Sequence, residues 1–468
     1  MNKLILSIVF TTFLVAYVIL DVTFDDELWV ISKSFAKSMQ QSIPTFELVV
    51  YEFFTYLVFI PPLAAFYCFI YDDNKLNSLL YLAVVIASAT TNELLKSIYH
   101  QARPYMIETD IQSLKCNSDY GKPSGHSQNS VVMIILMPIL LFPQIKNLGR
   151  NKVQVEIQKD LDRSESHTGY TINSLENSEL ENSQLEANDN IQSKFQIAMK
   201  LIIISFLLTS IIMTGISRVF LGVHSIGQVL LGWVWGLYIT LMYVFIIHDS
   251  LKRYILNLFY PQQSKHKEMN HFIPMAFFLL LVLLGLSLGL LKLNSLIYYE
   301  RLRMSSWIEK INQCKQTNYT RDSPQILYNS CFQFTGIGAI ITGLLVGAVL
   351  VQGSYDEGNF NKWKLKLSKT QFIKRLLSLL IPFIILIPFV FITSNNVVVQ
   401  LMCKILPISF GVGIIINGVF PFLLRKFNLQ IPGDFLFLCQ SQYLLCDLNK
   451  DSLQQQVKEY NDSYQNML

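Results

Sequence analysis

Apolar stretches of about 17 to 25 residues recur along this chain, and they restrict its fold more than any other feature. A stretch of that length crosses a bilayer as an α-helix, because lipid offers the backbone no hydrogen-bonding partners. Composition agrees, since 51% of the 468 residues are hydrophobic and only 15% are charged. We therefore predict an all-α, polytopic transmembrane helical bundle with nine or ten spans, near residues 4–20, 49–71, 79–99, 129–146, 198–216, 226–247, 272–292, 334–352, 371–394 and 399–424.

Changes in composition divide the chain into four parts. We expect a signal-anchor span and a lumenal amphipathic segment in residues 1–48, a membrane-embedded core in 49–248, additional transmembrane helices in 249–430, and a polar cytosolic tail in 431–468. Residues from about 147 to 195 are rich in Asn, Ser, Glu and Gln, which predicts a disordered cytosolic loop. The first span is expected to be retained rather than cleaved, because acidic residues follow it where a small-residue cleavage site would lie.

Three short polar clusters stand at the ends of apolar runs. They are Lys96 with Arg103-Pro104, then Pro123-Ser124-Gly125-His126, then Ser217-Arg218 with His224 and Gln228. The third span ends near the first cluster, the fourth begins at the second, and the fifth returns to the same side with the third. We therefore expect all three clusters to meet at one face of the membrane.

Cationic side chains in the first and third clusters are candidates for holding an anion. Lys96 and Arg103 are seven residues apart, so they project from nearly the same helix face, and Pro104 places Arg103 at the helix end. An unpaired arginine at the centre of a bilayer costs about 2.5–3.5 kcal/mol, so Arg218 requires an anionic partner or a watery cavity. The alternative for Lys96 and Arg103 is that they only reach toward the lipid headgroups.

The second cluster has the composition of an anion-binding helix start. Ser124 is a typical N-cap residue, and the first turn of a helix presents unpaired N–H groups to an anion. Gly125 allows a phosphate to approach the backbone closely. His126 adds a group that donates and accepts protons near neutral pH, although a turn with an incidental histidine is the alternative.

His224 and Gln228 are four residues apart and share a helix face. The amide oxygen of Gln228 can accept a hydrogen bond from Nδ1–H of His224, which leaves Nε2 as a nucleophile. The alternative is a histidine whose hydrogen bonds are satisfied in the core. The seven cysteines show no metal-ligand spacing, so we expect neither a metal nor a cofactor, and the small net charge of +4 does not indicate a nucleic-acid partner.

Together these residues resemble the superfamily of type 2 phosphatidic acid phosphatases, which includes bacterial acid phosphatases, vanadium haloperoxidases and glucose-6-phosphatase. The family pattern K-x6-R-P, P-S-G-H and S-R-x5-H-x3-D is matched at Lys96, Arg103, Pro104, Pro123 to His126, Ser217, Arg218 and His224. The resemblance covers about residues 50–248. It departs from the pattern at Gln228, where most members have aspartate and where glucose-6-phosphatases and dolichyl-diphosphatases have glutamine.

The resemblance implies a metal-independent phosphatase that cleaves a phosphate monoester. His224 would be the nucleophile that forms a phosphohistidine, His126 the general acid and base, and Gln228 the residue that orients His224. The residues that would bind the substrate phosphate are Lys96, Arg103, Ser124, Gly125 and Arg218.

A site at the membrane surface favours a lipid phosphate, such as a sphingoid-base phosphate, phosphatidate or polyisoprenyl phosphate. The alternative is a glucose-6-phosphatase-type sugar phosphatase, which Gln228 and the number of spans favour. Two other classes remain: a vanadium haloperoxidase, and a non-enzymatic lipid-binding or transport protein. The expected partners are the phosphorylated lipid or sugar substrate and membrane lipids.

Positive charge gathers on the membrane face opposite the clusters, between Lys362 and Arg375 and at Arg425-Lys426. The positive-inside tendency makes that face cytosolic, so we expect the clusters to face the lumen of the endoplasmic reticulum or another endomembrane. The loop 293–333 on the same side contains the glycosylation sequence Asn318-Tyr319-Thr320. It also contains Cys314 and Cys331, a candidate disulfide pair in an oxidising lumen.

Overall fold

Helices form every regular element in the part of the chain that the structure, a computed structural model, describes. The predicted loop near 147–195 and the tail 431–468 lie outside that part, so the structure does not test either prediction. The described residues are 3–41, 45–71, 75–140, 198–199, 201–259, 266–300, 304–318, 329–352, 369–394, 396–427 and 429.

In the first half of the bundle, the described residues form eight helices. They are α1 (Lys3–Thr23), α2 (Asp25–Gln40), α3 (Thr45–Leu57), α4 (Ile60–Tyr71), α5 (Lys75–Tyr99), α6 (Pro104–Ile107), α7 (Gly125–Leu140) and the helix Leu201–Phe220.

The second half consists of long helices with several local irregularities. Its elements are α11 (Ile226–Met242), η2 (Tyr243–Ile247), α12 (His248–Phe259), α13 (His266–Glu300), α14 (Met304–Lys315), α16 (Asn329–Gln352), α17 (Lys369–Leu380), η4 (Ile381–Leu386), α18 (Ile387–Val390), α19 (Val397–Gln400), η5 (Leu401–Ile405), α20 (Leu406–Ile414), η6 (Ile415–Val419) and α21 (Phe420–Lys426).

Seven segments among the described residues are long and apolar enough to cross a membrane. The predicted polytopic α-helical fold is therefore confirmed. The three remaining predicted spans take other forms. The second is divided into α3 and α4, the fourth is the shorter helix α7, and the seventh is the apolar part of α13, Leu280–Leu293.

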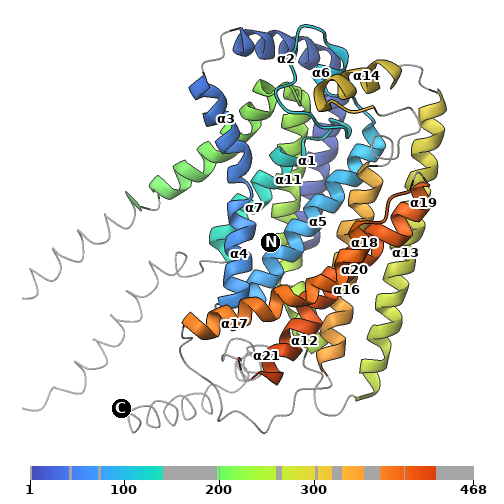
Figure 1. Ribbon diagram of the computed structural model, residues 1–468. Coiled ribbons are helices and arrows are strands. Elements are labelled where there is room, and N and C mark those ends of the chain that lie inside the picture. The colour runs from blue at the N-terminus through green and yellow to red at the C-terminus, as the bar shows by residue number, and fades with distance from the viewer. Residues whose placement is uncertain are drawn as a thin grey trace, which may run out of the picture.

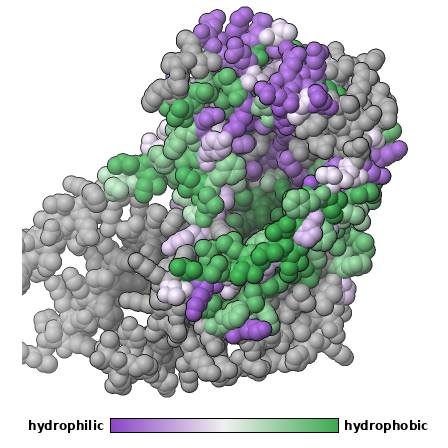
Figure 2. Space-filling view, viewed as in Figure 1, coloured by the Kyte–Doolittle hydropathy of each residue, from purple (hydrophilic) through white to green (hydrophobic). Residues whose placement is uncertain are grey.

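Helix packing places the ends of α5, α7 and α11 next to one another. α7 packs between α5 and α11, and α16 packs against α5, α13 and α20. The helices α2, α6 and α14 lie together at one end of the bundle, whereas α12, α17 and α21 lie toward the other end (Figure 1). Hydrophilic residues gather on the surface at the first end and hydrophobic residues cover the middle, with a hollow between them (Figure 2).

The predicted amphipathic segment is the helix α2, and it packs on the protein at the polar end. Trp29 Nε1 donates a hydrogen bond of 2.9 Å to Glu108, and Lys33 forms an ion pair of 2.5 Å with the same carboxylate. Ser32 Oγ accepts a hydrogen bond of 2.8 Å from the backbone of Ile226, at the start of α11. α2 therefore fixes both the loop after α6 and the start of α11.

One prediction about the polar end is wrong. Cys314 of α14 forms a disulfide with Cys116 and not with Cys331, which is buried. The reason is the position of α14, which lies over the loop that contains Cys116 and contacts α6. Cys331 instead lies at the start of α16, where it packs with Leu290 and Phe332 in an apolar cluster.

Candidate active site

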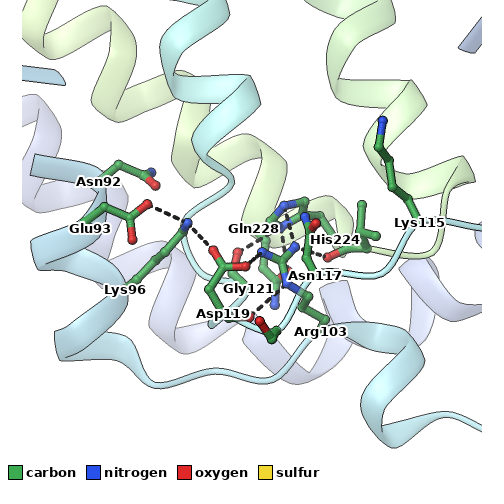
Figure 3. A network of polar contacts seen from close by, with 12 residues as sticks. Asn92, Glu93, Lys96, Arg103, Lys115, Asn117, Asp119, Gly121, His224 and Gln228 are labelled. Atoms are coloured by element: carbon green, nitrogen blue, oxygen red, sulfur yellow. Dashed lines mark hydrogen bonds and ion pairs between the residues drawn. The ribbon is translucent and has the colours of Figure 1, made fainter. Parts of the chain in front are cut away.

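The three polar clusters meet at a cavity of about 380 Å³ at the polar end of the bundle. Lys96 and Arg103 line it from the end of α5 and the turn after it, and Gly125 and His126 line it from the start of α7. His224 lines it from the turn before α11. The convergence predicted by counting membrane crossings is thus correct, and Figure 3 shows the polar network that joins several of these residues.

The ring of His224 is held on both sides by hydrogen bonds. Arg103 Nη1 lies 2.9 Å from Nε2, and a guanidinium can only donate, so Nε2 accepts. The proton must then be on Nδ1, which lies 2.9 Å from the carbonyl oxygen of Gly121 and 3.2 Å from Oε1 of Gln228. This tautomer directs the lone pair of Nε2 toward Arg103 and the cavity.

Gln228 is fixed by its position at the start of α11. Its backbone N–H donates to Ser225 Oγ at 3.2 Å, and its Oε1 accepts from the backbone of Ser225 at 3.3 Å, which forms a capping box. Its Nε2 donates to Gln101 Oε1 at 2.9 Å and to the carbonyl of Ala102 at 2.8 Å. An amide suits this position because it accepts from one side and donates to two acceptors on the other.

The cations reach the cavity because of local backbone geometry. α5 ends at Tyr99, and Arg103 is extended with φ −83° and ψ 151° before Pro104, as the proline predicts. Arg103 also donates from Nη1 to the carbonyl of Val223 at 2.9 Å. Arg218 is almost fully buried, and none of its three guanidinium nitrogens has a hydrogen-bond partner in the described part of the chain.

Asp119 is the most important residue here that the sequence analysis did not identify. Its carboxylate lies 2.6 Å from Arg103 Nη2 and 2.5 Å from Lys96 Nζ, and Lys96 also pairs with Glu93 at 2.8 Å. Burial alone would raise the pKa of the Asp119 carboxyl, but the charges of Arg103 and Lys96 lower that pKa well below its ordinary value. Asp119 is therefore ionised.

His224 lies in the turn between two spans, outside both. Burial lowers the pKa of its imidazole well below the ordinary value, and the nearby charges of Arg103, Arg218 and Lys96 lower it further. Both effects disfavour a cationic ring. His224 is therefore neutral near pH 7, the form that can act as a nucleophile.

Ser124, which the sequence analysis expects to bind phosphate, has its backbone N–H already engaged. Its backbone N–H donates to the carbonyl of Gln228 at 2.9 Å, so that donor is not available to an anion. Its Oγ accepts from the backbone and the hydroxyl of Ser127, at 3.4 and 2.9 Å. The donors left at the start of α7 are the N–H groups of Gly125 and His126, which have no partner within their own helix.

His126 faces the cavity from the first turn of α7. Its ring packs edge-on against the ring of Phe59, with the two centroids 5.9 Å apart. No hydrogen bond joins it to the other predicted site residues in the described structure. A substrate bound in the cavity between His126 and His224 could contact both imidazoles at once.

Several further residues complete the cavity from distant parts of the chain. Asn92 of α5 fixes the turn before α7, donating to the carbonyl of Pro123 at 3.4 Å and to Gln128 Oε1 at 2.9 Å. Lys315 of α14 and Gln333 of α16 line the opposite side. Asp119 precedes His126 by seven residues, so a search of the sequence for acidic residues near the clusters would find it. No sequence signal, by contrast, places α14 at the cavity.

No group of three or more metal-ligating side chains that could hold a metal ion occurs among the residues that the structure describes.

Comparison with known proteins identifies the segment that contains the site. Residues 77–252 match the family model of the PAP2 superfamily. A solved structure is also similar, the crystal structure of the first transmembrane PAP2 type phosphatidylglycerolphosphate phosphatase from Bacillus subtilis. It is 19% identical in sequence and aligns over 53% of this chain and 96% of that one, with a TM-score of 0.33. No curated protein matches the sequence.

Proposed function

Since this chain belongs to the PAP2 superfamily through residues 77–252 and is a phosphatase integral to the membrane, we propose that it hydrolyses a lipid phosphate monoester through a phosphohistidine on His224. The observation that carries the proposal is the buried contact between Arg103 and Nε2 of His224, within reach of the charge of Arg218, whose guanidinium has no hydrogen-bond partner among the described residues. This arrangement places a neutral imidazole among cations that can bind the oxygens of a phosphate. A non-enzymatic transport role is not retained.

The proposed reaction has two steps. As the phosphate binds to Arg103, Arg218 and Lys96, Arg103 releases Nε2 of His224, which attacks phosphorus. A bond forms between Nε2 and phosphorus, the bond from phosphorus to the alcohol oxygen breaks, and His126 gives that oxygen a proton. His126 then takes a proton from a water molecule, whose oxygen attacks phosphorus. The bond between phosphorus and Nε2 breaks, which releases inorganic phosphate and restores His224.

The walls of the cavity support a lipid as the substrate. Charged groups lie at one side, whereas Val58, Met133 and Ile337 line another part with apolar surface. The hollow at the border between hydrophilic and hydrophobic surface suits a molecule whose phosphate is at the headgroup level and whose chains are in the bilayer (Figure 2). Sphingoid-base phosphates, phosphatidate and polyisoprenyl phosphates have this form.

A sugar phosphate is the second candidate. Asn117, Ser118 and Gln333 add neutral polar groups to the cavity, and these can bind the hydroxyls of a sugar. Gln228 favours the same candidate, because glucose-6-phosphatases resemble this chain at that position.

Phosphate release by the detergent-purified full chain tests the proposal. We expect hydrolysis of the lipid phosphates to exceed that of glucose 6-phosphate by more than tenfold in kcat/KM, or about 1.4 kcal/mol in the barrier. Orthovanadate should inhibit and chelators should not. A reversed preference would select the sugar phosphate instead.

The nucleophile is tested by His224→Ala. We expect less than a tenth of the wild-type activity at normal expression, and loss of the acid-labile phosphoprotein that the wild type forms when the reaction is quenched in base. His248→Gln is the matched control, because His248 bonds Tyr243 far from the cavity. Activity above a tenth in His224→Ala would overturn the assignment.

A further inference from the structure

The carboxylate of Asp119 occupies positions where phosphate oxygens would bind. Its two oxygens lie 2.5 Å from Lys96 Nζ and 2.6 Å from Arg103 Nη2, and its backbone carbonyl accepts from Arg103 Nε at 2.9 Å. The side chain is 11% exposed and lines the cavity. Figure 3 shows it between the two cations. Two of the three cations expected to bind phosphate are thus already paired with an anion of the protein.

Arg218 differs from these two cations, because its guanidinium has no partner among the described residues. Of the three cations expected to bind phosphate, Lys96 and Arg103 are therefore ion-paired within the described structure and Arg218 has no hydrogen-bond partner there. A phosphate that engages all three must compete with Asp119 for the same N–H donors. Two anions within a few ångströms also repel each other, most strongly where water is excluded. Binding therefore requires the carboxylate to move away.

Lys315 provides a second place for the carboxylate. Its Nζ donates a hydrogen bond of 3.0 Å to Ser118 Oγ, one residue before Asp119, and it forms no ion pair in the described structure. The disulfide between Cys116 and Cys314 joins α14 to the loop, so Lys315 and Asp119 stay neighbours. Lys315 is thus a cation within reach of the loop that carries Asp119.

We propose that Asp119 is an affinity-determining residue of the phosphate site, an internal competitor that the substrate phosphate displaces from Lys96 and Arg103 toward Lys315. The inference rests on the proposed function, in that the entering anion is a phosphate monoester. It also gives the part of the chain beyond the PAP2 match a role, since α14 determines how easily the competitor leaves.

Binding of orthovanadate to the full chain in detergent, measured by calorimetry, tests this independently of turnover. Asp119→Asn keeps the shape of the side chain and removes its charge, and we expect its dissociation constant for vanadate to fall about tenfold. Asp110→Asn is the matched control, because Asp110 lies in the same loop, is exposed and forms its ion pair with Lys37 rather than with a residue of the cavity, so its constant should not change. If Asp119 merely positioned Lys96 and Arg103, Asp119→Asn would bind vanadate more weakly. Weaker or unchanged binding overturns the inference.

Lys315→Gln supplies the opposite test, which remains valid if Asp119→Asn does not fold. Removing the second partner should hold Asp119 on Lys96 and Arg103 and weaken vanadate binding several-fold. Equal or tighter binding overturns the inference. Tighter binding by Asp119→Asn, with no hydrolysis of any monoester by the wild type, would refute the proposed function and leave this inference standing. Hydrolysis of a monoester by the wild type, with no tighter vanadate binding by Asp119→Asn, would support the proposed function and refute this inference.

Discussion

At the scale of single residues, the nitrogen proposed to attack phosphorus is also the one that accepts a hydrogen bond from Arg103. This bond keeps the lone pair of His224 directed at the cavity and the proton on the other nitrogen. A phosphate oxygen that takes over the Arg103 donor frees Nε2 and places phosphorus near it at the same moment. In the proposed mechanism, substrate binding and activation of the nucleophile are therefore one event.

Gln228→Glu tests the account of the amide. A carboxylate would face the carbonyl of Ala102 and Oε1 of Gln101, which now accept from Gln228 Nε2. A buried acceptor left without a donor costs about 1–3 kcal/mol, so we expect a lower Tm and at least a tenfold lower kcat. The matched control is Gln112→Glu in an exposed loop position. Wild-type kcat and Tm in Gln228→Glu would contradict this account.

Thermal stability should depend on pH through His224. Its folded-state pKa lies well below the unfolded value of about 6.5, so below pH 6.5 the unfolded chain binds a proton that the folded chain does not. The free energy of unfolding should then fall as pH falls, by up to about 1.4 kcal/mol per unit.

Tm measured between pH 6.5 and 5 checks this, with a shallower slope expected for His224→Gln. The folded-state pKa of Asp119 is lowered too, and the stability that this contributes is lost only as pH falls below the unfolded value near 4. It therefore does not affect this window. An identical slope in the variant would show that His224 does not titrate as described.

At the scale of elements, a disulfide joins α14 to the loop that contains Cys116 and Asp119, across a sequence separation of 198 residues. The helix contributes Lys315 to the cavity and packs on α6, next to Arg103. An element far outside the PAP2 match thus forms one wall of the site.

Replacing Cys116 and Cys314 with serine should destabilise this end of the protein. Disulfides typically contribute about 2–4 kcal/mol, so we expect a lower Tm, and a raised KM because α14 is no longer held on the loop. Cys403→Ser, at an exposed free cysteine, is the matched control. Unchanged Tm and KM in the double variant would show that packing alone holds α14.

The elements also show what the sequence could predict. Hydropathy gives the spans because lipid enforces the length of each helix, and counting crossings then brings Arg103, His126 and His224 to one face. The disulfide partner of Cys314 was predicted wrongly because the two halves of the bundle meet through tertiary packing that no periodicity encodes. Asp119 was missed for a related reason, since it lies in a loop whose position depends on α2 and α14.

At the scale of the whole molecule, α2 and α14 lie together at the polar end (Figure 1), and the cavity and the disulfide lie at the same end. A disulfide persists in an oxidising compartment, which agrees with the lumenal orientation proposed from the charge distribution. The exposed Asn318, just after α14, begins the glycosylation sequence at the same end.

Expression in eukaryotic cells should therefore place a glycan on Asn318. We expect a mobility shift on treatment with an endoglycosidase and its absence in Asn318→Gln, whereas an Asn318→Gln protein should keep full activity because the side chain points away into solvent. A chain that carries no glycan, with cysteines at the polar end open to cytosolic reagents, would reverse the orientation.

The thermal stability of the fold should depend on whether an oxyanion is bound to the guanidinium of Arg218. A buried guanidinium without hydrogen-bond partners among the described residues lowers the stability of the native state, and an oxyanion that binds it compensates in that state alone. Preparations in phosphate buffer should therefore survive heating better than those in chloride. Inorganic phosphate, the product of the proposed reaction, should likewise inhibit the protein and stabilise it at the same concentrations.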